Sequence, residues 1–360
     1  MKRLNLIPRS EITLDTVIYE TVLFNADTTE TAEEAMPFCG NPDGIINPSA
    51  GPLAWAYSLQ EVMYNNDWRP KEVDMSKDKR HFLALPDDLK ESWELVVAGL
   101  IFNDSGQTRN LAANLAPFIT DGLLLLVLAR QVYEEAVHTL SYDVLVKDIG
   151  ADADRIYRLA REHKELKKRN QFLESMYANL AYEKNDGVTV KDLFIAMIAN
   201  NILEAMMFYG GFVFLWSFGN TMSGTAQMIA FIARDERMHV LFFRQLFNST
   251  LQSLPKVKRE SLREIVEQMV RESVKLEIEW LKMLTKGKLS GFSDTVIERY
   301  FFTKGDEIME ALGYDKIYNQ PASPLNALEL EYNNPNGIKS SPLEVTPKTY
   351  SAKKLSLDNF

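Results

Sequence analysis

The sequence predicts an all-α fold, a helical bundle with additional outer helices and a flexible C-terminal tail. Three observations support it. Helical patterns occupy most of the chain from about residue 86 to about 313, several predicted helices far exceed the usual length of about 11–12 residues, and three of them are apolar on nearly every side. Helices that are apolar all round belong in the interior of a bundle. Little in this region has the pattern of a strand.

The helices can be placed in chain order from their end signals. Pro86 and the two aspartates after it begin a helix that we expect to end at about residue 104, because proline and acidic groups fit a first turn. Thr120 and Asp121 are candidate N-caps of the next helix. The charge-rich segment 152–182 is expected to be an outer, solvated helix. With Gly or Pro at most joints, the predicted helices are 86–104, 121–147, 152–182, 190–217, 223–253, 256–286 and 294–313.

The two ends differ in composition from the bundle, so we expect three regions. Residues 1–67 mix short apolar runs with Pro, Gly, Asn and Asp, and are expected to wrap the bundle irregularly. Residues 68–320 would form the bundle itself. Residues 321–360 are rich in Pro, Asn, Ser, Gly and Lys, which predicts a flexible tail that is disordered on its own at least from Asn333.

Composition and charge narrow the class of function. The 360 residues are 46% hydrophobic and 25% charged, the mix of a soluble globular protein. A formal net charge of -10 disfavours nonspecific binding to nucleic acid. The single cysteine, Cys39, cannot form an internal disulfide, and the N-terminus lacks the apolar core of a signal peptide. We therefore expect a cytoplasmic protein.

One apolar stretch raises the question of a membrane span. No charged residue occurs from Ala205 to Ala233, but the polar and glycine-rich segment 219–224 interrupts this stretch in the middle. A membrane-spanning helix needs about 20 apolar residues without a break. We therefore expect two buried helices joined by a turn, and no membrane partner.

Two Glu-x-x-His patterns carry the chemistry. Glu135 precedes His138 by three residues, Glu236 precedes His239 by three, and the chain has only four histidines. Residues three apart share a helix face. Both pairs fall inside apolar helices, where an unpaired charge would cost on the order of several kcal/mol. Two such pairs on two buried helices indicate a carboxylate-bridged dinuclear metal site.

That site needs one more carboxylate from each remaining core helix. Glu204 is flanked by apolar residues, and Asp104 follows the apolar run 98–102. Four carboxylates and two imidazoles suit divalent iron or manganese better than zinc. The alternative is that Glu134 and Glu135 form a solvated face and that His239 is an ordinary core histidine. The expected ligands are Asp104, Glu135, His138, Glu204, Glu236 and His239.

An aromatic side chain follows the first motif. Tyr142 lies four residues, about one helical turn, after the motif histidine and so shares its face. A phenol beside an O2-activating metal pair, inside an apolar cage, suits a stored tyrosyl radical; spacing alone also allows a plain core tyrosine. Three apolar side chains are expected to project towards it, at helical spacing from the other carboxylates: Phe208, Phe212 and Ile232.

These residues resemble the small, radical-generating subunit of class I ribonucleotide reductase, a ferritin-like helical bundle. The similarity runs from about Ala35 to the C-terminus. Four blocks carry most of it, and together they are specific to this family. They are residues 68–74, 135–142, 203–209 and 232–239.

The resemblance implies two Fe ions per chain, with Mn possible, and divides the ligands between them. The ion nearer the radical would be bound by Asp104, Glu135 and His138. The other ion would be bound by Glu204, Glu236 and His239. The radical would reside on Tyr142, within the cage of Phe208, Phe212 and Ile232.

The resemblance also implies a path for the radical. Asp235 would hydrogen-bond His138 and orient that ligand. Trp68 would hydrogen-bond Asp235 and begin a route for the electron and proton towards the surface. Tyr350 resembles the tail tyrosine that relays the radical to the large subunit, and Glu344 matches an acidic residue of the same tail.

The reaction implied by the resemblance belongs to a complex. The oxidised metal centre would take an electron and a proton from Tyr142, and the hole would pass reversibly to a cysteine of a large subunit, where a ribonucleotide loses its 2′-hydroxyl. The small subunit would be a homodimer and would contact the large subunit through its C-terminal tail, in which residues 355–360 combine apolar anchors with a terminal carboxylate. If the metal were manganese, a flavoprotein activase would be a further partner.

Some features depart from the family or leave alternatives open. Gln131 stands where many bacterial members have a tryptophan, and residues 1–34 match nothing in the family. Gly210 and Gly211 indicate either a local distortion near the site or close helix packing. The rival functions are another dimetal oxidase, hydroxylase or desaturase with an open substrate pocket, and a ferritin-like metal store.

Overall fold

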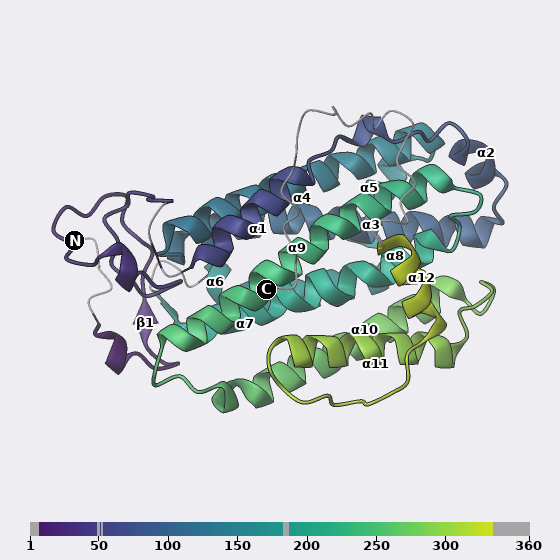
Figure 1. Ribbon diagram of the computed structural model, residues 1–360. Helices are drawn as coiled ribbons and strands as arrows, with labels where there is room; N and C mark the ends of the chain where they lie inside the picture. Colours follow the sequence, from purple (N-terminus) through teal and green to yellow (C-terminus); the bar gives the residue numbers. More distant parts are fainter. Residues whose placement is uncertain (1–6, 49–50, 52, 183–186, 334–360) are drawn as a thin grey trace.

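The predicted all-α bundle is confirmed by the computed structural model, which describes residues 7–48, 51, 53–182 and 187–333. Helix α3 packs on α4 and α8, and α9 packs on α4, α7 and α8 (Figure 1). These helices form the core of the bundle. Their bounds are α3 Asp87–Asn110, α4 Gly122–Ile149, α7 Val190–Ile202, α8 Phe208–Trp216 and α9 Ser223–Ser253.

The remaining elements surround this core. The α10–α11 pair runs along one side of it in Figure 1. The other α-helices are α1 Ala54–Asn65, α2 Asp78–Leu83, α5 Ala153–Glu162, α6 Lys164–Tyr182, α10 Arg263–Thr285, α11 Asp294–Ala311 and α12 Pro324–Asn333. Two π-helical turns, η4 Leu111–Leu115 and η6 Leu203–Met207, follow α3 and α7. Short 3-10 helices are Arg9–Glu11, Ala32–Glu34, Pro70–Glu72, Ala116–Phe118 and Arg259–Leu262. Strands β1 Val17–Ile18 and β2 Val188–Thr189 pair antiparallel.

Local sequence signals set several helix ends. The Asp121 carboxylate accepts hydrogen bonds from two backbone N–H groups in the first turn of α4, so Asp121 is its N-cap. Thr120 instead donates its hydroxyl to the Met36 carbonyl, at 2.6 Å. Gly150 ends α4 with a φ of 74°, a left-handed conformation that glycine adopts without steric cost.

The first core helix extends beyond its predicted end. Helix α3 continues to Asn110 instead of stopping at about residue 104. Gln107, beyond the predicted end, is buried and donates to the Asn200 side chain at 2.5 Å. A neighbouring helix thus supplies this polar side chain with a partner, which favours continuation of the helix.

The charge-rich segment 152–182 is not one solvated helix. His163, with an extended backbone at φ -70° and ψ 122°, separates α5 from α6. Helix α6 then buries one side against the bundle, including Leu173, Tyr177 and the charged Arg169. The prediction of a solvated helix was wrong because charge content does not show which face meets a neighbour.

The N-terminal region is also less irregular than expected. Within residues 1–67, the segment Ala54–Asn65 forms helix α1, which packs on α4 and α9. Its residues Ala56, Leu59 and Met63 are fully buried at helical spacing. Burial of this apolar stripe gives the segment its helical structure.

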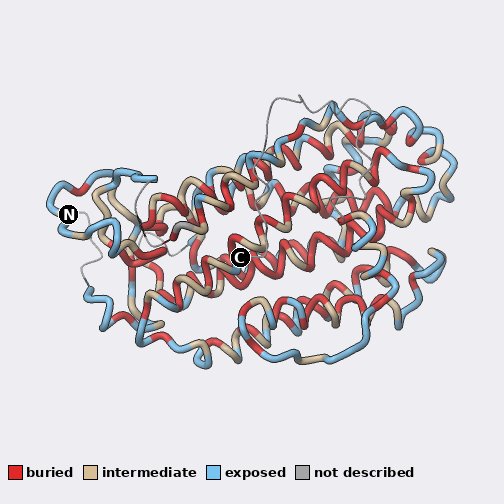
Figure 2. Tube along the Cα trace, viewed as in Figure 1, coloured by how far each residue is buried: buried red, intermediate tan, exposed pale blue. Residues whose placement is uncertain are grey.

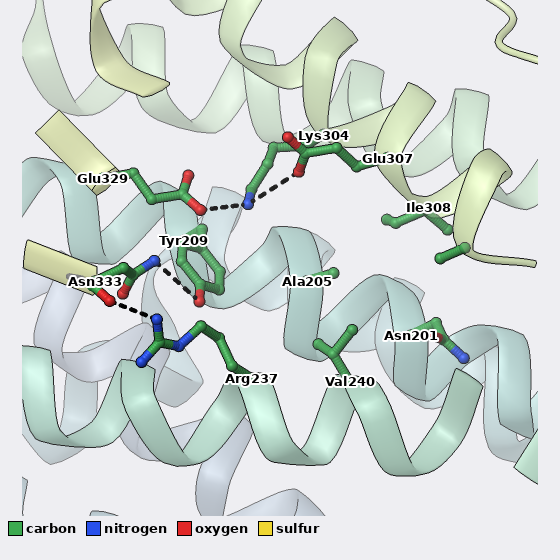
Figure 3. Close-up of a pocket in the computed structure, with 11 residues that line it drawn as sticks. Asn201, Ala205, Tyr209, Arg237, Val240, Lys304, Glu307, Ile308, Glu329 and Asn333 are labelled. Atoms are coloured by element: carbon green, nitrogen blue, oxygen red, sulfur yellow. Dashed lines mark hydrogen bonds and ion pairs between the residues drawn. The ribbon is translucent and has the colours of Figure 1, made fainter. Parts of the chain in front are cut away.

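Part of the segment predicted as a flexible tail, residues 321–360, is helical. Helix α12 packs against α8, α9 and α11. Tyr332 stacks on Trp216 with ring centroids 5.2 Å apart, and Glu329 accepts from the Lys304 ammonium at 2.7 Å (Figure 3). These contacts hold residues that composition alone assigned to the tail. Residues 334–360, with Glu344 and Tyr350, lie outside the described residues.

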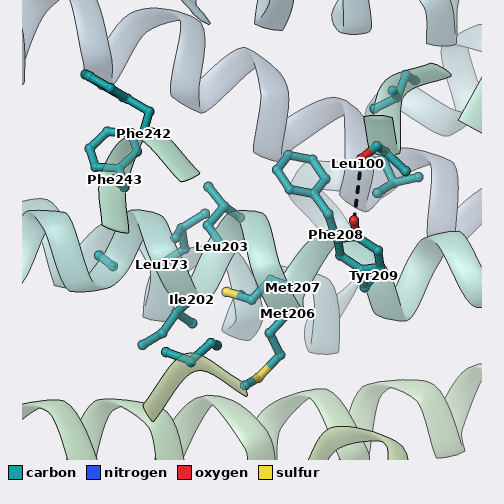
Figure 4. Packing of buried hydrophobic residues seen from close by; sticks show 14 of the residues in the cluster. Leu100, Leu173, Ile202, Leu203, Met206, Met207, Phe208, Tyr209, Phe242 and Phe243 are labelled. Atoms are coloured by element: carbon teal, nitrogen blue, oxygen red, sulfur yellow. Dashed lines mark hydrogen bonds between the residues drawn. The ribbon is translucent and has the colours of Figure 1, made fainter. Parts of the chain in front are cut away.

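Burial follows the core helices along their length (Figure 2). Among the described residues, the stretch Val190–Trp216 is long and apolar enough to span a membrane, but 89% of its most apolar window is buried inside the protein. Ile202, Leu203 and Met207 of this stretch pack among other apolar side chains (Figure 4). The stretch is a core helix, as expected.

The paired glycines of α8 allow close helix packing. A Cβ atom added at Gly211 would lie 3.1 Å from Leu100 of α3, and one at Gly210 would lie 3.1 Å from Glu277 and from Phe301. At such distances the neighbouring side chains would have to shift by a few tenths of an ångström to accept a larger residue on either side of α8. The glycines therefore lie at close helix contacts, and a local distortion, the π-helical turn η6, also ends three residues before Gly210.

The fold makes a testable prediction at the start of α9. Asp78, which is fully buried, accepts hydrogen bonds from the backbone N–H groups of Gly224 and Thr225, at 3.2 and 2.5 Å, and from the Thr225 hydroxyl at 2.7 Å. Asp78→Ala would leave these buried donors without a partner and should lower the free energy of unfolding by about 1–3 kcal/mol. Urea unfolding measures it. The exposed Asp87→Ala serves as control and should keep the wild-type midpoint; equal midpoints for both variants would contradict the role of Asp78.

Candidate metal centre

The six expected ligands meet at one place inside the bundle. Asp104 comes from α3, Glu135 and His138 from α4, Glu204 from η6, and Glu236 and His239 from α9; all are fully buried. They form two groups whose ligand atoms lie within 4.8 Å of one another. The groups are Asp104, Glu135, His138 and Glu236, and then Glu135, Glu204, Glu236 and His239. Because Glu135 and Glu236 belong to both, either carboxylate can bridge two ions.

The imidazoles present the same nitrogen to the carboxylates. His138 Nδ1 lies 3.2 Å from Asp104 Oδ1 and 3.1 Å from Glu236 Oε1. His239 Nδ1 lies 2.6 Å from Glu236 Oε2 and 3.3 Å from Glu135 Oε1. Both Nδ1 atoms therefore face the space between the carboxylates.

The donor atoms fit bound metal ions. Buried polar atoms normally have hydrogen-bond partners. Among the described residues, several buried atoms of this cluster have none, although each lies beside other polar atoms. They are both carboxylate oxygens of Asp104, Glu135 Oε2, His138 Nδ1, Glu204 Oε2 and Glu236 Oε1. Oxygen and nitrogen atoms that converge without donors between them are what divalent iron or manganese ions require.

The charges of the cluster also fit cations. Burial raises the pKa of Asp104 to about 7 and that of Glu204 to about 8. Burial also acts on Glu236, but the adjacent His138 and His239 outweigh it and hold the pKa of Glu236 below its usual range. Two divalent ions would neutralise this concentration of carboxylates without relying on protons.

The outer ring nitrogen of each imidazole, Nε2, lies close to a further carboxylate outside the six-residue set. His138 Nε2 lies 3.3 Å from Asp235 Oδ2, which accepts from the Trp68 indole N–H at 2.7 Å. The three predicted residues of the path are thus linked in order from the cluster outward. A carboxylate on the outer nitrogen of a ligating histidine fixes its orientation.

The corresponding carboxylate for His239 is Glu134, which the sequence analysis did not assign. Glu134 Oε2 lies 2.9 Å from His239 Nε2, and Glu134 Oε1 accepts from Arg130 Nε at 2.9 Å. Glu134 is 2% exposed, so the alternative of a solvated face is wrong for it. The available signal was Arg130 four residues earlier, at the spacing of a helical ion pair.

Two amides hold the carboxylates. Gln131 Nε2 lies 3.1 Å from Glu135 Oε1 and 3.3 Å from Glu204 Oε1, so Gln131 donates towards two ligands at once. Gln107, also missed from sequence, donates to Glu204 Oε1 at 3.0 Å. These contacts give one oxygen of each carboxylate a hydrogen-bond donor, whereas Glu135 Oε2 and Glu204 Oε2 have none.

The expected radical tyrosine lies in a dry environment. Tyr142 is fully buried, and burial, with the nearby Asp104 carboxylate adding to it, raises the pKa of its phenol well above the usual value. Phe208, Phe212 and Ile232 are also fully buried. Phe208 and Phe212 stack on each other, with ring centroids 5.7 Å apart.

A separate pocket of about 230 Å³ is lined by residues of α7, η6, α8, α9, α11 and α12 (Figure 3). Its described lining includes Tyr209, Arg237, Lys304, Glu329 and Asn333, and no member of the six-residue set. Arg237 donates to the Asn333 carbonyl at 2.5 Å, and the Asn333 amide lies 3.5 Å from the Tyr209 hydroxyl. Helix α12 therefore forms one wall of this pocket.

Comparison with known proteins identifies the family. The profile of the family described as "Ribonucleotide reductase, small chain" matches residues 47–324. The ribonucleoside-diphosphate reductase β subunit of Halalkalibacterium halodurans is 28% identical over 347 residues, which cover 95% of this chain and 96% of that protein. The β subunit of Treponema pallidum is 27% identical, covering 96% and 99%.

A solved structure gives the same result. The ribonucleotide reductase R2 subunit from Clostridium botulinum superimposes with a TM-score of 0.82 at 26% identity, covering 88% of this chain and 99% of that chain. The match spans the bundle that carries all six clustered residues. The chain therefore belongs to the ribonucleotide reductase small-chain family, the radical-generating subunits of an oxidoreductase.

Proposed function

We propose that this chain generates and stores a tyrosyl radical on Tyr142 for a large subunit that reduces ribonucleoside diphosphates, as the names of its relatives indicate. The observation that carries the proposal is the convergence of two buried Glu-x-x-His pairs with two further carboxylates, linked through His138 to Asp235 and Trp68. The bundle supplies the ligands, and family membership supplies the reaction class.

The six clustered residues would hold two iron or manganese ions. Asp104 and His138 would bind one ion, Glu204 and His239 the other, and the shared Glu135 and Glu236 would bind both. Bound in this way and oxidised by O2, or by another oxidant if the ions are manganese, the metal pair would supply the oxidising power that removes an electron from the Tyr142 phenol. Carboxylate-rich sites on facing helices of a bundle are suited to both metals.

The protein would control the radical through burial. Because burial keeps the Tyr142 phenol protonated, its oxidation requires the proton to leave with the electron. Asp104, whose charge acts on the phenol, is a candidate acceptor for that proton. The apolar Phe208, Phe212 and Ile232 would exclude water and reductants from the oxidised ring.

The route out of the centre would follow the hydrogen-bonded path. His138, Asp235 and Trp68 form a continuous series in which an electron can move inward while the Asp235 carboxylate holds the proton of the imidazole or of the indole. Trp68 is 6% exposed and lies at the outer end. Tyr350 would continue the route to the large subunit.

Family membership supports a proposal for partners and location. Small chains of ribonucleotide reductase work with a large subunit and typically form dimers. We propose that this chain is a cytoplasmic homodimer, that its residues 334–360 dock on the large subunit, and that a flavoprotein activase is required if the metals are manganese. The net charge of -10 argues against a nucleic-acid partner.

The rival functions have less support. A dimetal hydroxylase, desaturase or oxidase needs a substrate pocket open to its metals, whereas the pocket of Figure 3 has its described lining outside the ligand set. A metal store has no use for the Trp68–Asp235–His138 series. No observation in the described residues favours either rival.

The ligand set predicts metal stoichiometry. Apoprotein titrated with Mn(II) should bind two ions per chain. Glu204→Ala should lower the affinity for one of these ions by more than about tenfold, because that ion loses a carboxylate ligand. EPR of free Mn(II) measures both. Glu94→Ala, which removes a buried carboxylate paired with Arg155, is the control and should keep both ions. Absence of stoichiometric metal in the wild type would refute the ligand assignment.

The radical assignment predicts a specific loss. After anaerobic Fe(II) loading and exposure to O2, the wild type should show a tyrosyl EPR signal, and Tyr142→Phe should show none while binding the same amount of iron. Tyr177→Phe is the matched control, because Tyr177 is also buried, and burial together with the charges of Glu204 and Glu135 raises the pKa of its phenol. Loss of the signal in the control alone would place the radical on Tyr177 instead.

The relay predicts that radical storage and turnover can be separated. Trp68→Phe removes the indole N–H bonded to Asp235, so it should keep the Tyr142 signal but lose ribonucleotide reduction with the large subunit. Tyr350→Phe should behave in the same way. Trp55→Phe, a tryptophan of α1 packed on Phe242, should keep both properties. Full turnover by Trp68→Phe would exclude this route.

A further inference from the structure

A buried ion pair is formed by Arg169 and Glu277, and the hydrogen-bond partners of its guanidinium are next to or within the segments that carry two of the six ligands. Arg169 of α6 and Glu277 of α10 have side chains 3% and 0% exposed, and Arg169 Nε donates to Glu277 Oε1 at 2.6 Å. Desolvating two charges costs several kcal/mol per ion, and their attraction offsets this only when further hydrogen bonds satisfy both groups. The remaining contacts of Arg169 therefore indicate what the pair does.

The guanidinium uses its other nitrogens to join two ligand-bearing segments. Arg169 Nη1 donates to the side chain of Asn103, at 3.2 Å, and Asn103 immediately precedes the ligand Asp104 in α3. Arg169 Nη2 donates to the backbone carbonyl of Met207, at 2.6 Å. Met207 is the last residue of η6, the π-helical turn that carries the ligand Glu204.

The π-helical turn explains why such a donor is needed. A π-helical turn replaces i→i+4 hydrogen bonds with i→i+5 bonds, as the Phe208 N–H bond to the Leu203 carbonyl shows. The change of register disturbs the regular pairing of carbonyls at the end of the turn. A charged donor on the Met207 carbonyl stabilises this register, which sets the direction of Glu204.

The neighbouring helices leave space for the pair. A Cβ atom added at Gly99 of α3 would lie 3.9 Å from Arg169 Nη1, and one at Gly210 would lie 3.1 Å from Glu277 Oε2. The contact at Gly99 is ordinary van der Waals packing, whereas at Gly210 a larger residue would press directly on the Glu277 carboxylate. The planar guanidinium of Arg169 donates hydrogen bonds in three fixed directions, which a lysine ammonium cannot reproduce.

We propose that Arg169, held by Glu277, is a positioning residue that fixes the separation between Asp104 and Glu204, and so allows the centre to bind two metal ions as one coupled pair. The inference rests on the proposed function, since it assigns these two residues to different ions. Arg169 acts through Asn103 and Met207 and does not touch the metals.

The test uses the full chain and Mn(II) alone as the probe. Arg169→Lys keeps the charge beside Glu277 but loses the fork. The substitution should lower the affinity for the second Mn(II) ion about 10- to 100-fold, the usual loss when a residue that orients metal ligands is changed. The EPR signature of a coupled pair should give way to that of isolated Mn(II). In the apoprotein, backbone amides of residues 203–208 should exchange hydrogen faster than in the wild type.

A matched control separates positioning from general stability. Arg259→Lys makes the same chemical change at an arginine that also donates to a backbone carbonyl, of Leu312, and to an asparagine side chain, of Asn248 at 2.9 Å. It should keep the coupled pair and the exchange rates of 203–208. The melting temperature of each variant shows how much stability each substitution removes.

Every outcome decides the proposal. Two tightly bound, coupled Mn(II) ions in Arg169→Lys, or losses equal to those of Arg259→Lys, would overturn it. If Arg169→Lys does not fold, Gly210→Ala, whose methyl group would press on Glu277, replaces it with the same readouts and expectations. If the wild type binds no metal pair, the proposed function fails, while the exchange rates of 203–208, which need no metal, still test the positioning role.

Discussion

The burial of charge inside an apolar bundle is the constraint on which the rest of this structure depends. Four carboxylates and two imidazoles are fully buried where α3, α4, η6 and α9 meet. Groups of this kind are stable in such a place only when cations and hydrogen bonds compensate them. The long helices supply the rigid frame, and the surrounding polar contacts supply the compensation. Radical storage on Tyr142 would use the same dry interior.

The centre is organised as two similar halves. In one half His138 is held by Asp235 and Trp68, and in the other His239 is held by Glu134 and Arg130. The two halves differ in the side chain that donates a hydrogen bond to the carboxylate, an indole in one half and a guanidinium in the other. An indole can take part in electron transfer, whereas a guanidinium cannot, so the same geometric device would serve conduction on one side and only orientation on the other.

The contacts of charged residues show where sequence patterns mislead. Segment 152–182 has the charge content of a solvated helix, yet Arg169 is buried and joins two ligand-bearing segments. Glu134 has the appearance of a surface residue beside Glu135, yet it holds His239. Helix α12 lies in the segment that was predicted to be a tail, yet Tyr332 and Glu329 attach it to α8 and α11. In each case the partner comes from a segment more than 20 residues away or from another helix.

The sequence by itself determined the helical class, most helix positions and all six members of the cluster, because helical periodicity, caps and Glu-x-x-His spacing are local properties of the chain. It also determined the order Trp68, Asp235, His138, through resemblance to a family. Only the tertiary structure decided which oxygens and nitrogens face one another, that Glu134, Gln107 and Arg169 support the centre, and that α3 continues past Asp104. The physical reason is that these features depend on which face of one helix meets another, and a one-dimensional pattern of charges does not contain that information.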